Sequence, residues 1–69
     1  MKYGARNQLQ GTVTEIKEGS IMSEAVVELD SGAVMTSVMT MDSLKDLDLK
    51  KGDQVKLVVK AVNVLLVKE

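Results

Sequence analysis

Polar donors gather at three places in a chain that is otherwise rich in aliphatic side chains. The first is the segment GARNQ at residues 4–8, where Arg6 offers five N–H donors in a planar fork that suits an oxyanion. The second is Lys60, which stands between apolar neighbours in the segment VVKAVNV. Each cation also has an ordinary explanation: Arg6 suits a surface ion pair, and Lys60 suits a charge that protects an edge strand or reaches water from an outward face.

The third place is the segment TMDS at residues 40–43, where a strand is expected to run into a helix. The N–H groups of a first helical turn attract anions, and the hydroxyls of Thr40 and Ser43 add donors. Ordinary helix capping accounts for the same residues. Together the three places supply a guanidinium, an ammonium, hydroxyls and backbone N–H groups without an aromatic surface. This set favours a small tetrahedral oxyanion over a nucleobase or an apolar ligand.

Strands and glycine-containing turns must position these groups. We expect strands at residues 9–17, 22–30 and 34–40, because β-branched residues and alternation of apolar with polar side chains are typical of strands. Gly11 would permit a bend or a bulge in the first of them. Asp30–Ala33 is expected to form a tight hairpin turn in which Gly32 adopts a positive φ.

The second half of the chain changes its pattern after Thr40. Residues 42–49 predict one or two helical turns with Asp42 or Ser43 as N-cap, and residues 51–53 predict a turn. Residues 55–67 form the most apolar stretch, and their six valines favour one long bent strand, or two strands meeting near Ala61, over a helix. Five strands with a helix after the third are in the order of an OB-type barrel.

The predicted fold is therefore mainly β: a five-stranded OB-like barrel with one short helix between strands 3 and 4, forming a single domain over residues 1–69. A domain of 69 residues buries only about 60% of the surface of its unfolded chain, so its stability alone is marginal. Chains of this size usually add disulfides, a metal or oligomerisation, and this chain has neither Cys nor His. Self-association is the remaining way for this chain to gain stability.

The composition excludes several classes of chemistry. Without Cys and His there is no cysteine nucleophile, no Cys/His zinc site and no histidine base, so we expect no enzyme. Asp42, Asp46 and Asp48 show no evident clustering for a hard metal ion, and we expect no metal bound directly by the protein. The expected site therefore holds an anion through hydrogen bonds and charge.

The net charge and the number of aromatic residues also limit which kinds of partner this chain can bind. The net charge is −1 and Tyr3 is the only aromatic residue, whereas an OB module that binds nucleic acid normally needs a basic surface and stacking aromatics. No stretch approaches the ~20 apolar residues of a membrane span, and no signal-peptide pattern is present. We therefore expect a cytoplasmic protein that binds neither nucleic acid nor membrane.

Several of these residues also resemble a known family. Ala-Arg-Asn-Gln-Leu at residues 5–9, Thr40-x-x-Ser43 and Lys60-Ala61, together with Gly11, Gly32 and Gly52, resemble the molbindins, small proteins that bind molybdate. The match runs from about Gly4 to Val67 in the order and spacing of the family. The resemblance implies an OB-like barrel that assembles with its own copies, as a homohexamer built as a trimer of dimers, and that binds oxyanions at subunit interfaces.

The resemblance also implies which residues hold the anion. One subunit would contribute Gly4, Ala5 and Arg6, and its neighbour Thr40, Ser43, Lys60 and Ala61. A second class of site, around a threefold axis, would use backbone N–H groups of Gly19, Ser20 and Ile21. Family members commonly carry Ser where this chain has Gly4. Loss of that hydroxyl would remove a hydrogen bond worth ~1.5–3 kcal/mol, or roughly tenfold to a hundredfold in affinity.

The function that these features indicate is cytoplasmic binding and storage of molybdate, or of tungstate, as an intact oxyanion. The alternative is a homo-oligomeric structural or regulatory interaction module in which anion binding is weak or lost, and Gly4 is the residue that favours it. Added molybdate would not change the behaviour of such an interaction module, here called the platform. A storage protein would bind the anion, so the response to molybdate distinguishes the two hypotheses.

Overall fold

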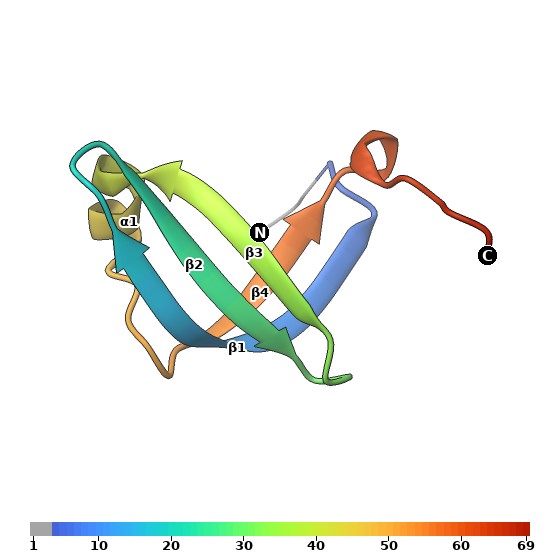
Figure 1. The fold of residues 1–69 in the computed structure, drawn as a ribbon, viewed down its shortest axis with the longest axis horizontal. Helices are drawn as coiled ribbons and strands as arrows, with labels where there is room; N and C mark the ends of the chain where they lie inside the picture. Colours follow the sequence, from blue (N-terminus) through green and yellow to red (C-terminus); the bar gives the residue numbers. More distant parts are fainter. Residues whose placement is uncertain (1–3) are drawn as a thin grey trace.

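Residues 4–69 are described by the computed structural model, and four strands in them form one antiparallel sheet in the order β3-β2-β1-β4 (Figure 1). The elements are β1 (Asn7–Glu18), β2 (Met22–Leu29), β3 (Val34–Thr40), the helix α1 (Met41–Leu47), β4 (Gln54–Val59) and a 3-10 turn, η1 (Ala61–Asn63). The first three strands and the helix after the third lie where the sequence predicts them. The sheet curls into a half-barrel with β3 and β4 as its two edges.

The long strand β1 bends and pairs with a neighbouring strand on each side. Its first half pairs with β4 and its second half with β2. Gly11 lies where the two halves meet and pairs with both strands, opposite Val55 of β4 and Leu29 of β2. A Cβ atom on Gly11 would lie 2.6 Å from the carbonyl oxygen of Glu28, so a side chain here would collide with β2. Gly11 therefore permits the close approach at the bend. The bulge lies farther along, where the register shifts between Val13 and Glu15.

The core is small and lies on the concave face of the half-barrel. Val13, Val27 and Leu29 form its centre, and Leu49, Val55 and Leu57 are among the partly buried side chains that pack against it. Leu44 is the one buried residue of α1. Few side chains are therefore fully removed from water, as expected for so short a chain.

Two turns and the helix start follow simple backbone rules. Gly32 and Gly52 have φ values of +95° and +96°, so the expected hairpin turn and the turn at residues 51–53 are confirmed. The N-cap of α1 is Thr40, and the prediction of Asp42 or Ser43 was wrong. Thr40 has extended backbone (φ −68°, ψ 155°), and its Oγ1 accepts a hydrogen bond from the N–H of Ser43 at 3.1 Å. Asp42 and Ser43 already lie inside the helix, where a residue cannot cap.

The predicted fifth strand is absent from the described part of the chain, residues 4–69. After β4 and Lys60, the 3-10 turn η1 leads into residues 64–69, which have no regular structure and extend away from the sheet (Figure 1). The turn is closed by hydrogen bonds from Asn63 N to Lys60 O (2.9 Å) and from Val64 N to Ala61 O (3.2 Å). It directs the chain away from both sheet edges, so residues 64–69, here called the C-terminal tail, have no neighbouring strand with which to pair.

The half-barrel consequently has an open side. A groove of about 650 Å³ lies between the two edge strands, with Met35 and Met39 on β3, Leu57 and Val59 on β4, and Val13 at its floor. Within residues 4–69, no helix has the length and apolar character needed to cross a membrane.

Candidate oxyanion site

One end of the molecule brings the two predicted cations together. The ladder between β1 and β4 ends with the pair Asn7–Val59, so Arg6, just before β1, and Lys60, just after β4, follow this pair at the same end of the two strands. Gly4 and Ala5 lie just before this point and Ala61 just after it. We call these five residues the cationic end (Gly4, Ala5, Arg6, Lys60, Ala61).

The charges of the cationic end are not neutralised within the described chain. Arg6 and Lys60 are both exposed, and among residues 4–69 neither side chain has an ion-pair or hydrogen-bond partner. The two ion pairs found there, Lys17–Glu24 at 3.6 Å and Lys50–Asp48 at 3.7 Å, involve other residues. Two adjacent cations without a carboxylate create a local positive potential that attracts an anion, although the chain as a whole carries −1.

Thr40 and Ser43 lie at the start of α1, beside the turn between β1 and β2. The N–H of Met41 donates to the carbonyl oxygen of Ile21 at 2.7 Å, which ties the helix start to that turn. The residues predicted for the second site are therefore neighbours of Thr40 and Ser43. We call this group the helical end (Gly19, Ser20, Ile21, Thr40, Ser43).

Some donors of the helical end are already engaged. Thr40 Oγ1 accepts from Ser43 N and donates to Ser43 Oγ at 3.0 Å, which leaves the Ser43 hydroxyl proton as the free donor of the pair. The N–H of Met41 is bonded to Ile21, and the N–H of Gly19 is bonded to the carbonyl oxygen of Met22 at 2.9 Å. The helical end can therefore offer fewer backbone donors to an anion than the sequence pattern indicates.

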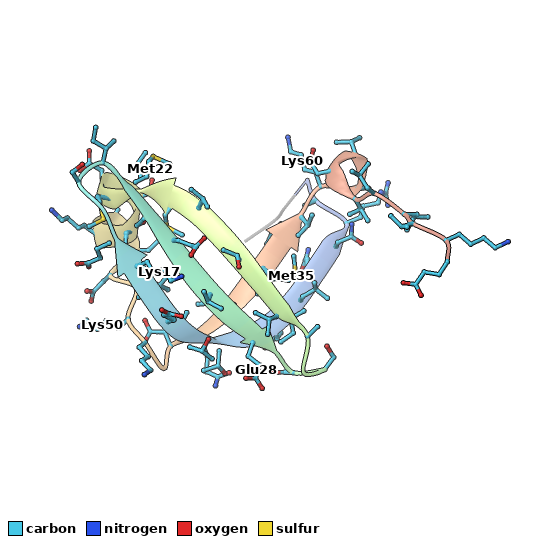
Figure 2. The ribbon with its side chains drawn as sticks, in the orientation of Figure 1. Lys17, Met22, Glu28, Met35, Lys50 and Lys60 are labelled. Carbon is cyan, nitrogen blue, oxygen red and sulfur yellow. The ribbon has the colours of Figure 1, made fainter. Side chains whose placement is uncertain are left out.

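The cationic end and the helical end lie at opposite ends of one copy. Figure 2 places Lys60 far from Met22, the residue that pairs with Thr40 across β2 and β3. The molecule measures 37 × 25 × 22 Å, so no single small anion spans it. Within one copy, Arg6 and Lys60 therefore lie at the same end, whereas Thr40 and Ser43 lie far from Lys60. A site built from both groups has to draw on at least two copies.

The position of Gly4 is open. A Cβ atom built on Gly4 would meet no other atom within 4 Å, and its φ lies outside the left-handed range that favours glycine. The missing serine hydroxyl is therefore not excluded by sterics. The described residues also contain no group of three or more carboxylate, Cys or His side chains that could hold a metal ion. The donors at both ends match an oxyanion and not a bare cation.

One feature was not predicted from the sequence, namely the groove between β3 and β4. The available signal was the pair Met35 and Met39 on the same face of residues 34–40, because apolar residues on both faces of a strand indicate contacts on both sides. From the sequence, we expected those contacts to lie inside a closed barrel.

Comparison with known proteins gives a consistent result. The TOBE domain model matches residues 4–66. A curated relative, molybdenum-pterin-binding protein 3 of Clostridium pasteurianum, is 38% identical over 66 residues, covering 96% of this chain and 97% of its own. Each of these matches spans nearly the whole chain.

Solved structures agree with the sequence matches. A molybdate-binding protein from Sporomusa ovata is 40% identical with a TM-score of 0.92, over 99% of this chain and all of that one. The cytoplasmic molybdate-binding protein ModG, solved with molybdate bound, is 41% identical with a TM-score of 0.84, over 88% of this chain and 43% of that one. The resemblance stated from residues 5–9, 40–43 and 60–61 is thereby confirmed, and the chain belongs to the molbindin family of TOBE-domain proteins.

Proposed function

We propose that this protein binds molybdate as an intact tetrahedral dianion, through hydrogen bonds and charge alone. The observation that carries the proposal is the cationic end, where Arg6 and Lys60 adjoin the paired ends of β1 and β4 without a carboxylate partner in residues 4–69. Relatives over the whole chain length are named for binding molybdenum-pterin or molybdate. A guanidinium and an ammonium both form charge-assisted hydrogen bonds to oxyanion oxygens, which are about twice as strong as neutral ones.

The site belongs to an assembly of copies. The cationic end of one copy supplies Ala5, Arg6, Lys60 and Ala61, and the helical end of another supplies Thr40 and Ser43. This division differs from the one that the resemblance implies, because Lys60 lies beside Arg6 and far from Thr40 within a copy. We propose a homohexamer, a trimer of dimers, with a second site for which Ser20 and Ile21 are the candidate donors.

The role that fits this chemistry is storage or buffering of molybdate in the cytoplasm, without catalysis. Tungstate has the same charge and shape and binds the same donors. ModG, a structural neighbour, is described as a cytoplasmic molybdate-binding protein. Release then requires only that the hydrogen bonds break, because no covalent bond joins the protein to the anion.

Titration calorimetry with molybdate tests the proposal. Lys60→Ala removes one of the two cations and is expected to weaken binding at least tenfold, because a hydrogen bond to a charged group is worth ~1.5–3 kcal/mol. Lys51→Ala is the matched control, since Lys51 lies in the turn before β4 and is exposed. Equal affinity of the Lys60→Ala variant and the unmodified protein would refute the assignment.

The second candidate function is the homo-oligomeric platform with weak or lost anion binding. Gly4 is the observation that favours it, because the cationic end lacks one hydroxyl donor. Native mass spectrometry separates the two functions: a storage protein gains several molybdate masses and none of sulfate, whereas a platform keeps its mass with either anion.

A further inference from the structure

We infer that the oxyanion site selects its ligand by charge: it accepts tetrahedral dianions and rejects monoanions of the same shape and size. The inference rests on the proposed function and specifies the class of anion that the site takes. Hydroxyl and backbone N–H donors alone would not separate such ligands, because they hydrogen-bond to the oxygens of any oxyanion. Selection by charge requires fixed positive charges that no nearby carboxylate offsets.

Positive and negative side chains are segregated along this chain. Residues 1–14 and 54–68 together contain five Lys or Arg and no Asp or Glu, whereas residues 15–53 contain nine Asp or Glu against four Lys. The first half of β1 and the whole of β4 fall within the two segments free of carboxylates, and they pair side by side (Figure 1). This part of the sheet is therefore cationic, although the chain as a whole carries −1.

Arg6 and Lys60 stand at the end of this paired region, and neither has an ion-pair or hydrogen-bond partner in the described chain. Lys50, by contrast, lies between two carboxylates. Its ammonium group pairs with Asp48 at 3.7 Å, and its backbone N–H donates to the carboxylate of Asp53 at 2.9 Å. An anion at the cationic end thus meets two positive charges that no carboxylate of the neighbouring strands offsets.

The helical end adds donors but no positive charge. Thr40 and Ser43 are neutral, and Asp42, which lies between them in the sequence, makes the first turn of α1 acidic. The one basic residue of this helix, Lys45, lies in its last turn. The hydroxyls therefore contribute hydrogen bonds to any tetrahedral oxyanion, and discrimination by charge has to come from the cationic end.

Charge selection at such a site follows from Coulomb's law. The attraction to a cation is proportional to the charge of the anion, so a dianion is attracted twice as strongly as a monoanion of equal size. A dianion also loses more hydration energy when it binds. Because Arg6 and Lys60 are both exposed, the bound anion keeps part of its water shell, and the added attraction exceeds the added cost of desolvation.

Tungstate and perrhenate provide the test, because both are tetrahedral oxyanions of nearly equal size that differ by one unit of charge. Sulfate would not serve, since it differs from tungstate in size and not in charge. Titration calorimetry on the full chain at one ionic strength, with perrhenate measured by competition against tungstate, gives the two affinities. Tungstate is expected to bind more tightly by about tenfold or more, because both cations attract the additional charge.

Four variants separate charge from hydrogen bonding. Lys60→Met keeps a long side chain without its charge and is expected to weaken tungstate binding roughly tenfold to a hundredfold. Perrhenate binding should weaken by only the square root of that factor, about threefold to tenfold, because its charge is half as large. Lys60→Arg keeps the charge and should keep the preference for tungstate. Ser43→Ala removes a neutral donor and should weaken both anions by the same factor, whereas Lys51→Ala, in the turn before β4, should change neither.

Equal affinities for tungstate and perrhenate would overturn the inference, and so would a Lys60→Met variant that weakens both anions by the same factor. Either result leaves the proposed function standing, because the protein would still bind an oxyanion. If neither molybdate nor tungstate binds to the full chain, the proposed function itself fails. Circular dichroism checks that each variant retains its strands.

Discussion

Arg6 and Lys60 repel each other wherever they lie side by side. In water the repulsion of two unit charges is small, about 1 kcal/mol at 4 Å, so the unliganded protein tolerates the pair. A dianion bound between the two adds two attractions, which outweigh this repulsion. The same exposure means that the attraction is screened by salt, and titrations should be made at one ionic strength.

Gly4→Ser is expected to tighten molybdate binding by roughly tenfold to a hundredfold, because it restores one hydroxyl donor to a charged ligand. The side chain has room, since nothing lies within 4 Å of its Cβ position. Gly4→Ala is the control, because it adds the Cβ atom without the hydroxyl. If calorimetry gives the same affinity for the serine and alanine variants, residue 4 does not contact the anion through its side chain.

Thr40 caps the start of α1, and substitution of its side chain tests this role. Thr40→Ala removes the N-cap oxygen and is expected to cost ~1 kcal/mol, whereas Thr40→Ser keeps it. For a domain of this size that loss lowers the melting temperature by about 4–8 °C. Thermal unfolding followed by circular dichroism measures the difference, and equal melting temperatures for the two variants would contradict the capping role.

Among the elements, β1 depends most on one residue. Gly11→Ala places a Cβ atom 2.6 Å from the carbonyl oxygen of Glu28, so the backbone of β1 or β2 must shift. We expect a loss of ~1–3 kcal/mol in the free energy of unfolding, as for other overpacked sites. Gly4→Ala serves as control and should leave stability unchanged. Urea denaturation compares the two, and a Gly11→Ala variant as stable as the control would show that β1 and β2 separate there at little cost.

The elements that were predicted correctly are those decided by local sequence. Strands at residues 22–29 and 34–40 follow from alternation and from Gly32 between them, and the helix follows from a change of period after Thr40. The N-cap was wrong by two or three residues because Thr, Asp and Ser all cap well, and only the backbone conformation decides among them.

The last segment was wrong for a different reason. Valine and leucine in residues 55–67 favour a strand, but a strand exists only where another strand is available to pair with it. That information is not local, and within one copy η1 separates the tail from every edge. The residues that would hold the anion were named from residue types and from the family resemblance, and this assignment stays a prediction. The placement of Lys60 beside Arg6 and far from Thr40 was not predicted, because it depends on which strand ends lie side by side.

At the scale of the whole molecule, a site shared between copies couples affinity to protein concentration. Dilution of the protein below its own dissociation constant should weaken molybdate binding, and molybdate should in turn favour the assembled form by the same factor. Calorimetry at two protein concentrations tenfold apart, with sedimentation at each, checks this. Identical affinities across a range in which the assembly dissociates would show that one copy holds a complete site.

The exposed C-terminal tail also affects how long a lone copy survives. A newly synthesised chain without a partner displays Leu65, Leu66 and Val67 almost fully to water. An unpaired apolar terminus of this kind is readily cut by proteases and captured by chaperones. An assembly that covers these side chains would therefore slow degradation, so lone copies should be turned over faster than assembled ones. The amount of binding protein would then be set by how readily its copies meet, as well as by how many are made.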